Sequence, residues 1–374
     1  MGNTIVPFVD LKAQYKSIKG SMDRAIFNVI TNAHFIHGSE VVEFEKKFAD
    51  YLGASQCIAV NSGTEALILG IRALNLKPGD EVIVPVNTFI ASALGITENN
   101  LRPVFVDMDP DDYGISLKDL KRKISKKTRA IIVVHLYGKP DKLNEINKII
   151  KESGQNIYLI EDACQAHGAM YHGEKVGTTG IFSAFSYYPG KNLGAYGDGG
   201  AIVTNDDDLA RKYGMLREYG QKVKYYHDSL GVNSRLDTIQ AAVLLVKLTH
   251  LDVWNKKRQG LAEYYNKQLN SLASMVSTPK DFSDRKSVYH VYLVEVDKRD
   301  ELLKYLNDHG IQALIHYPIP LHLQKAFDYL GYKKGDFPNA EKSAGRILSL
   351  PMYPELTKKQ IDYVVSTIQK FYDK

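Results

Sequence analysis

A regular alternation of two kinds of segment over residues 1–250 is the feature that most constrains how this chain can fold. Short runs rich in valine and isoleucine alternate with stretches of helical spacing, such as 64–74 and 141–153. The runs are apolar at consecutive positions, which is typical of strands buried on both faces. They are CIAV (57–60), VIVP (82–85), VFVD (104–107), AIIVVH (130–135), IYLIED (157–162), FSAF (182–185) and AIVT (201–204). The pattern predicts an α/β fold in which helices sandwich a mainly parallel, seven-stranded sheet.

Beyond residue 234 the pattern changes, and a second unit is expected. Residues 235–270 have the spacing of one very long helix or of two joined helices. They are followed by a strand-like stretch at 288–296, a helical one at 299–309, an apolar one at 311–317, and helical ones at 340–350 and 357–372. Because a domain averages about 150 residues, we expect a large domain at 1–250 and a smaller C-terminal α+β domain at 251–374.

Composition argues against several classes of protein. The net charge of +5 is small for 374 residues, and the densest basic stretch, 121–129, fits the polar face of one helix, so no nucleic-acid partner is expected. Apolar runs such as 241–246 are far shorter than the roughly 18 residues of a membrane helix, so no membrane partner is expected. The cysteines, Cys57 and Cys164, form no CxxC pair, which favours the reducing cytoplasm.

Two segments that follow predicted strands carry polar groups, and open parallel sheets bind ligands beyond the carboxyl ends of their strands. NSGTEAL (61–67) brings the hydroxyls of Ser62 and Thr64 to a helix start, where free backbone N–H groups suit a phosphate. An ordinary helix cap has the same pattern. Asp162 and Gln165 follow the fifth run. A carboxylate there either pairs with a protonated ring nitrogen, or is solvated or caps a turn.

The third segment is FSAFSYYPGKNLGAYGDGG (182–200), in which Lys191 stands alone among small and aromatic residues. One interpretation is a solvated turn lysine. The other is a partly desolvated lysine in a cleft, whose lowered pKa frees the amine for Schiff-base chemistry. A phosphate cradle, a carboxylate for a pyridinium nitrogen and a Schiff-base lysine together fit pyridoxal 5′-phosphate. The sequence has no HExxH, GxGxxG or GxxxxGK[ST], so neither a metal nor a dinucleotide is expected.

Five motifs, in order, carry a resemblance to a known family. They are NSGTEAL (61–67), NTFIASA (87–93), EDACQAHGA (161–169), FSYYPGKNLGAYGDGG (185–200) and GVNSRLDTIQAA (231–242). The sequence resembles the DegT/DnrJ/EryC1/StrS family of pyridoxal-phosphate-dependent sugar aminotransferases over nearly its whole length, from 7–15 to the closing helices. The resemblance implies fold type I, the fold of aspartate aminotransferase.

The resemblance also implies roles for individual residues. Lys191 matches the Schiff-base lysine, Asp162 the carboxylate at the pyridine nitrogen, and Gln165 the group near the ring hydroxyl. The cofactor contacts it implies are Gly63, Thr64 and Ser186 at the phosphate, beside the Ser62 hydroxyl, and Phe89 stacked on the ring. Asn233 matches a phosphate contact that the family supplies from the partner subunit. A homodimer with shared active sites is therefore expected.

The implied reaction is transfer of an amine from L-glutamate to a nucleotide-linked keto sugar. Residues 187–200 look more like members that act at C-3 than at C-4, and closest to transaminases of dTDP-3-keto-6-deoxyhexoses. Candidate sugar or nucleotide contacts are Phe35, Tyr188, His316, Tyr317 and His322, and purely structural roles remain open for the last three. The sugar configuration, the nucleobase and the pathway stay open.

Three other functions are alternatives to a sugar aminotransferase. Some family members are dehydratases with histidine in place of the lysine, and Lys191 argues against that reading. A non-catalytic regulatory protein on the same fold is the second, and the complete set of Lys191, Asp162 and Gln165 argues against it. A cofactor-free protein that binds nucleotide sugars is the third, and the colour of the purified protein would distinguish it.

Overall fold

The computed structural model describes residues 5–373, and its centre is a seven-stranded sheet. Each of the seven predicted runs is one strand of it: β1 (Gln56–Val60), β2 (Glu81–Pro85), β3 (Arg102–Val106), β4 (Thr128–Val134), β5 (Tyr158–Asp162), β8 (Phe182–Ser186) and β9 (Gly200–Thr204). The order across the sheet is β1-β9-β8-β5-β4-β2-β3, and β9 is the one strand that runs against the other six. The predicted mainly parallel sheet is confirmed.

Helices cover both faces of this sheet, as the unbroken apolar runs predict. On β2, Val82 and Val84 pack into one core cluster while Ile83, between them, packs into another. The first cluster includes side chains of α3 (Gly63–Ala73), α4 (Ala91–Thr97) and α7 (Asp207–Leu216). The second includes side chains of α2 (Ser39–Leu52), α5 (Leu117–Lys123), α6 (Leu143–Glu152) and α8 (Thr238–Leu248). Burial of this apolar surface is the main driving force for the fold.

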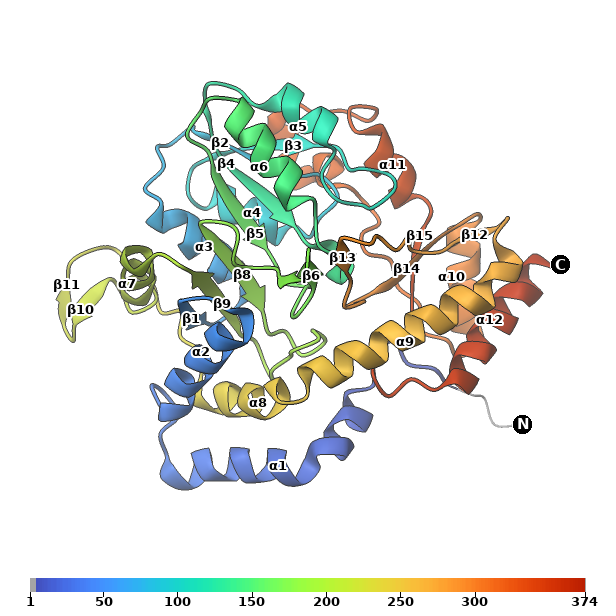
Figure 1. The fold of residues 1–374 in the computed structure, drawn as a ribbon, viewed down its shortest axis with the longest axis horizontal. Coiled ribbons are helices and arrows are strands. Elements are labelled where there is room, and N and C mark those ends of the chain that lie inside the picture. Colours follow the sequence, from blue (N-terminus) through green and yellow to red (C-terminus); the bar gives the residue numbers. More distant parts are fainter. Residues whose placement is uncertain (1–4, 374) are drawn as a thin grey trace.

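The stretch at 235–270 forms two helices, which is one of the two predicted alternatives. α8 ends at Leu248 and α9 (Leu251–Leu269) begins three residues later. α1 (Leu11–Asn32) lies along α8, and its Ile18 and Met22 pack with Val243 and Trp254. From α8, α9 runs away from the sheet to α10 (Arg299–Asp308) and α12 (Lys358–Tyr372) (Figure 1).

The C-terminal part is built on an antiparallel sheet of order β12-β14-β15. Its strands are β12 (Val276–Ser277), β14 (Tyr292–Val296) and β15 (Ile347–Leu350). The helix expected at 340–350 is therefore partly wrong. α11 (Pro338–Ala344) ends before Gly345, and residues 347–350 form a strand because they pair with β14, from Tyr292 with Leu350 to Glu295 with Ile347. The domain boundary near residue 250 stays a prediction.

Shorter elements complete the chain. They are the strands β6 (Met170–Tyr171), β7 (Glu174–Lys175) and β13 (Arg285–Lys286), the hairpin of β10 (Gln221–Val223) and β11 (Tyr226–His227), and the 3-10 turns η1 (Leu136–Gly138), η2 (Asn270–Leu272), η3 (Leu321–Leu323) and η4 (Lys325–Leu330). The hairpin projects from the molecule beyond α7 (Figure 1). Within residues 5–373, none of the helices is both long enough and apolar enough to cross a membrane.

Candidate active site

The three polar segments predicted from the sequence meet beyond the carboxyl ends of β1, β5 and β8. A Cβ atom built on Gly63, after β1, would lie 2.7 Å from Cβ of Ser186 at the end of β8. The same atom would lie 2.9 Å from Sγ of Cys164, which follows β5. Only glycine allows this approach, so the close packing of the three segments depends on Gly63.

The first turn of α3 has the features of a phosphate cradle. Ser62 caps the helix, because its Oγ accepts a hydrogen bond from the N–H of Glu65 (3.1 Å). The N–H groups of Gly63 and Thr64 belong to the first turn, where a helix offers no internal acceptor. Gly200 adds a second close approach, since a Cβ there would lie 2.3 Å from the carbonyl carbon of Ser62. N–H groups without an internal acceptor at a helix N-terminus fit the phosphate of the predicted cofactor.

Asp162 is a fixed, buried carboxylate at the end of β5, with 6% of its surface exposed. Its Oδ2 accepts a hydrogen bond from Ser92 Oγ (2.7 Å), and its Oδ1 accepts one from the N–H of Cys164 (3.2 Å). The Ser92 hydroxyl in turn lies 3.0 Å from Thr88 Oγ1. Two donors orient the carboxylate and leave acceptor capacity for a protonated ring nitrogen.

Gln165 is held beside Asp162 by two tyrosines. Its Oε1 accepts a hydrogen bond from the backbone N–H of Tyr137 (2.7 Å), which fixes the orientation of the amide. Its Nε2 therefore faces the hydroxyl of Tyr317 at 3.1 Å. The ring of Phe89 packs against Tyr317, with ring centroids 5.7 Å apart, and half of the surface of Phe89 is exposed. A half-exposed aromatic ring that packs against Tyr317 suits stacking on a cofactor ring.

Lys191 lies in a loop that several hydrogen bonds hold in place. Its own N–H donates to the carbonyl of Tyr188 (2.8 Å), and the buried Lys247 of α8 donates to the carbonyl of Gly194 (2.7 Å). Burial lowers the pKa of Lys191, against the opposing effects of Cys164 and Asp162. A lysine with a lowered pKa has more of its amine in the nucleophilic, neutral form.

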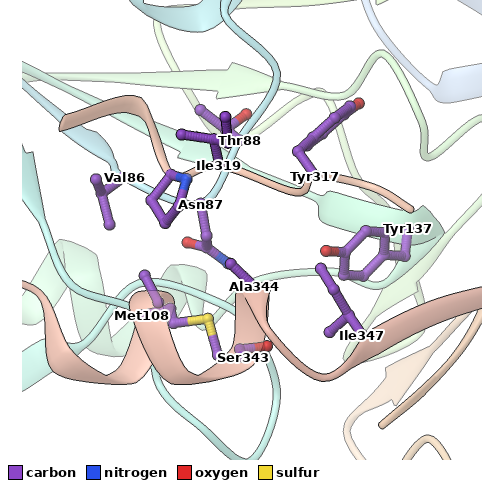
Figure 2. A pocket seen from close by; sticks show the side chains of 12 residues that line it. Val86, Asn87, Thr88, Met108, Tyr137, Tyr317, Ile319, Ser343, Ala344 and Ile347 are labelled. Carbon is purple, nitrogen blue, oxygen red and sulfur yellow. The ribbon is translucent and has the colours of Figure 1, made fainter. Parts of the chain in front are cut away.

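Tyr317 also lines a small pocket, which lies between the ends of β2 and β3 and helix α11 (Figure 2). Asn87 lies at its centre, and its Oδ1 is buried without a hydrogen-bond partner while its Nδ2 donates to the carbonyl of Tyr113 (3.0 Å). The lining residues are Val86, Asn87, Thr88, Met108, Tyr137, Tyr317, Ile319, Pro320, Ala340, Ser343, Ala344 and Ile347. The pocket offers an apolar wall and one free acceptor.

The predicted histidines are held by partners outside the three polar segments. His322 is buried, with its Nε2 3.0 Å from Glu341 Oε1 and its ring against Phe337, which indicates a structural role. His316 pairs through Nδ1 with Ser349 Oγ (2.9 Å), and burial, with the charge of Lys191, lowers its pKa to about 4.

Three further predicted residues lie at the surface. Phe35 and Tyr188 are 46% and 60% exposed, and Asn233 is exposed in the loop before α8.

Sequence reasoning missed several residues that shape the site. Ser92 carries the hydrogen bond to Asp162, and its position in the NTFIASA motif, three residues after Phe89, was an available signal. Tyr137 gave no local signal, because its role depends on a residue distant in the sequence. Asn192 lies in the motif at 185–200, but its partners are distant in the sequence. Among residues 5–373, no group of three or more His, Cys, Asp or Glu side chains is arranged to hold a metal ion.

Comparison with known proteins identifies the family. Residues 16–369 match the model of the DegT/DnrJ/EryC1/StrS aminotransferase family. The chain belongs to this family. The predicted resemblance is thereby confirmed, and so are the fold class, the assignment as an aminotransferase and pyridoxal phosphate as its cofactor.

Three curated relatives of this family member cover almost the whole chain. A "pleiotropic regulatory protein" of Geobacillus stearothermophilus is 45% identical, over 98% of each chain. The dTDP-3-amino-3,4,6-trideoxy-alpha-D-glucose transaminase of Streptomyces venezuelae is 41% identical, over 99% of this chain and 97% of the relative. The dTDP-3-amino-3,6-dideoxy-alpha-D-galactopyranose transaminase of Aneurinibacillus thermoaerophilus is 43% identical, over 98% and 99%.

Two solved structures share the fold of this chain. DesV of S. venezuelae, in complex with a ketimine intermediate, superposes with a TM-score of 0.95 at 41% identity, covering 99% of each chain. NtdA of Bacillus subtilis, with the bound cofactor PMP, has a TM-score of 0.85 at 30% identity, covering 96% of this chain and 83% of that one.

Proposed function

We propose that this aminotransferase converts a nucleotide-linked keto-6-deoxyhexose, with dTDP-3-keto-6-deoxyhexose as the favoured substrate, into the amino sugar with L-glutamate as donor. The observation that carries the proposal is the meeting of a partly buried lysine of lowered pKa, Lys191, with a fixed carboxylate, Asp162, and a helix N-terminus at one sheet edge. The two relatives named as dTDP-3-amino-sugar transaminases support the C-3 position.

The residues present fit the cofactor. Ser62, Gly63, Thr64 and Ser186 would hold its phosphate, Phe89 and Gln165 would contact its ring, and Asp162 would keep the ring nitrogen protonated. When bound, pyridoxal phosphate withdraws electrons from the carbon that carries the amine. The amine of Lys191 would take the proton from that donor carbon and deliver it to the C4′ carbon of the cofactor, and would move it in the opposite direction when the keto sugar is aminated, which is general base and acid catalysis.

A homodimer with shared sites belongs to the same proposal. The β10–β11 hairpin carries exposed aromatic side chains, with Tyr225 at 78% and Tyr226 at 72%, and Leu230 after it is 93% exposed. A second group of exposed apolar side chains lies on and between α1 and α2: Phe27, Ile30, Phe35, Ile36 and Val42. Gathered exposed apolar side chains favour a protein–protein interface. Asn233, in the exposed loop before α8, would reach the phosphate site of the partner.

The cytoplasm is the proposed compartment, and two cysteines without a disulfide agree with it.

A C-4 transaminase of the same family is the alternative enzyme. A regulatory protein is a second candidate function, because the relative from Geobacillus stearothermophilus carries that name. Lys191 and Asp162 favour the enzyme.

A panel of substrates tests the proposal. Purified protein is incubated with glutamate and with nucleotide-linked 3-keto or 4-keto sugars, and the position of the new amine is read by NMR. We expect a yellow protein, cofactor fixed to Lys191 by borohydride, and an amine at C-3. An amine at C-4 would establish the alternative enzyme. A colourless protein that takes up no cofactor would rule out catalysis.

A further inference from the structure

Asn192, the residue after Lys191, is held on three sides by residues far away in the sequence. Its side chain is 3% exposed. Its Nδ2 donates to Asn255 Oδ1 (2.9 Å) and to the carbonyl of Val288 (3.0 Å), and its Oδ1 lies 3.2 Å from His290 Nδ1. The three partners come from α9 and from the segment before β14. The loop that carries Lys191 is therefore hydrogen-bonded both to α9 and to the segment before β14.

Backbone carbonyls fix which way the two amides face. Asn255 is 4% exposed, and its Nδ2 donates to the carbonyl of His167 (2.8 Å). A carbonyl only accepts, so the NH₂ of Asn255 faces His167 and the NH₂ of Asn192 faces Val288. The oxygen of Asn192 is left facing His290.

This orientation determines the tautomer of His290. An amide oxygen cannot donate a hydrogen bond, so the hydrogen in the contact with Asn192 belongs to Nδ1 of the imidazole. Burial lowers the pKa of His290 well below its ordinary 6.5, and nearby positive groups act in the same direction. These groups are Lys191, Arg258, His316 and His167. In its neutral form the ring therefore carries its hydrogen on Nδ1 and its lone pair on Nε2.

We propose that Asn192 and His290 form a positioning pair for Lys191, in which His290 is a neutral imidazole locked as the Nδ1–H tautomer. The consequence for catalysis rests on the proposed role of Lys191. The backbone beside the lysine cannot shift without breaking the hydrogen bonds of Asn192. Because a misplacement of about 1 Å costs on the order of a hundredfold in rate, loss of the pair is expected to lower turnover.

The first test reads the tautomer directly, in protein without cofactor. Wild-type protein labelled with ¹⁵N-histidine is measured by NMR around neutral pH, and His290 is assigned with the variant His290→Asn. We expect hydrogen on Nδ1 in the wild type, and loss of this preference in Asn192→Ala. Hydrogen on Nε2 in the wild type, or an unchanged tautomer in Asn192→Ala, would overturn the lock.

The second test concerns Lys191. Asn192→Ala should lower kcat on the order of a hundredfold, with KM little changed, and should shift the pH at which the absorbance of bound cofactor changes. Asn99→Ala is the matched control, because Nδ2 of Asn99 also donates to two backbone carbonyls, of Ile68 (3.0 Å) and Gly95 (2.8 Å), away from the site. It should leave both readouts unchanged.

Two substitutions of the histidine decide the case even if Asn192→Ala fails to fold. The amide of His290→Asn places a donor near the position of Nδ1 and should retain most of the wild-type kcat, whereas His290→Leu removes the donor and should lose it. Full kcat in His290→Leu overturns the positioning role. A wild-type protein that turns over no sugar would refute the proposed function, while the tautomer measured without cofactor would still decide the pair.

Discussion

Lys191 and Asp162 show how burial sets the chemistry of single residues. Burial lowers the pKa of the lysine, so its amine loses its proton more readily than at the surface. The carboxylate is buried as well, and hydrogen bonds from Ser92 and from the N–H of Cys164 compensate part of its lost hydration. In the proposed mechanism, the lysine exchanges a proton and the carboxylate pairs with the ring nitrogen of the cofactor.

Replacement of Lys191 by alanine should remove the proton carrier and the covalent attachment of the cofactor. We expect turnover to fall by several orders of magnitude, while the thermal transition stays close to that of the wild type. The measurement is kcat, together with mass spectrometry after borohydride treatment. Lys212→Ala, which changes an exposed lysine on α7, is the control. Near-normal turnover of Lys191→Ala would contradict the assignment.

Replacement of Asp162 by asparagine should leave a coloured but nearly inactive protein. A neutral amide does not stabilise a protonated ring nitrogen, so kcat should fall at least on the order of a hundredfold, the size seen when a preorganised electrostatic partner is lost. Cofactor binding through the phosphate should persist. Absorbance spectra and steady-state kinetics measure the two effects. Activity within a few-fold of the wild type would make Asp162 a structural residue.

At the scale of elements, the side chains of the last two residues of β5 lie on opposite faces of the sheet. Asp162 faces the site, whereas Glu161 is fully buried and accepts hydrogen bonds from His135 Nε2 (3.0 Å) and from the N–H groups of Gly177, Thr179 and Gly180 (2.7–2.8 Å). Glu161 thereby anchors the loop that leads into β8. The hydrogen bonds of Glu161 thereby hold the end of β5, and with it Asp162, from the face opposite the site.

Glu161→Gln should destabilise the protein by about 2 kcal/mol, as expected when hydrogen bonds to a buried carboxylate are lost and its replacement turns an NH₂ group toward N–H donors. Burial alone would raise the pKa of Glu161, but the hydrogen bonds from His135 and the loop N–H groups lower it overall below 4.5. A lowered folded-state pKa means that its stabilising contribution is present above the unfolded pKa and is lost as pH falls through the folded pKa.

Thermal melting against pH measures this contribution. The wild type should lose more stability than Glu161→Gln as the pH falls below about 4.5. Glu152→Gln, which alters an exposed ion pair with Lys121, is the control and should change stability little. Parallel curves for Glu161→Gln and the wild type would contradict the prediction.

Elements that bury both faces were predictable from the sequence, because their apolar runs are continuous. The seven strands of the large sheet follow from these runs alone. The strand at 347–350 could not be predicted in this way, since its apolar residues also fit the end of a helix and its partner β14 lies about 50 residues earlier. Pairing over such a distance outweighs a local preference.

The residues of the candidate site also differ in how far the sequence predicts them. Lys191, Asp162 and the Ser62–Thr64 turn follow strands directly, so their meeting at one edge could be predicted from the order of the elements. The contact of Asn192 with His290 joins residues 98 positions apart and gave no signal in the sequence. The side chain of His322, a candidate substrate contact for which a structural role was left open, is buried and paired with Glu341, which favours the structural role.

At the scale of the whole molecule, the proposed dimer makes a prediction that mixed dimers test. Lys191→Ala and Asn233→Asp are each expected to be inactive. If Asn233 acts on the partner, a dimer of one chain of each kind has one site with both defects and one with neither, so about half of the sites regain activity. Homodimers of each variant are the controls. No rescue after verified subunit exchange would place Asn233 within its own site.

Helix α9 has a consequence for how the molecule comes apart. Trp254 near its start packs with α1 and α8, and Tyr265 and Leu269 near its end lie in the C-terminal core. Between them, Arg258 donates to the carbonyls of Tyr289 (3.1 Å) and Met352 (2.8 Å). Melting of either half would strip α9 of part of its packing, so heat should denature the chain in one cooperative transition, without a calorimetric shoulder at the predicted boundary near residue 250.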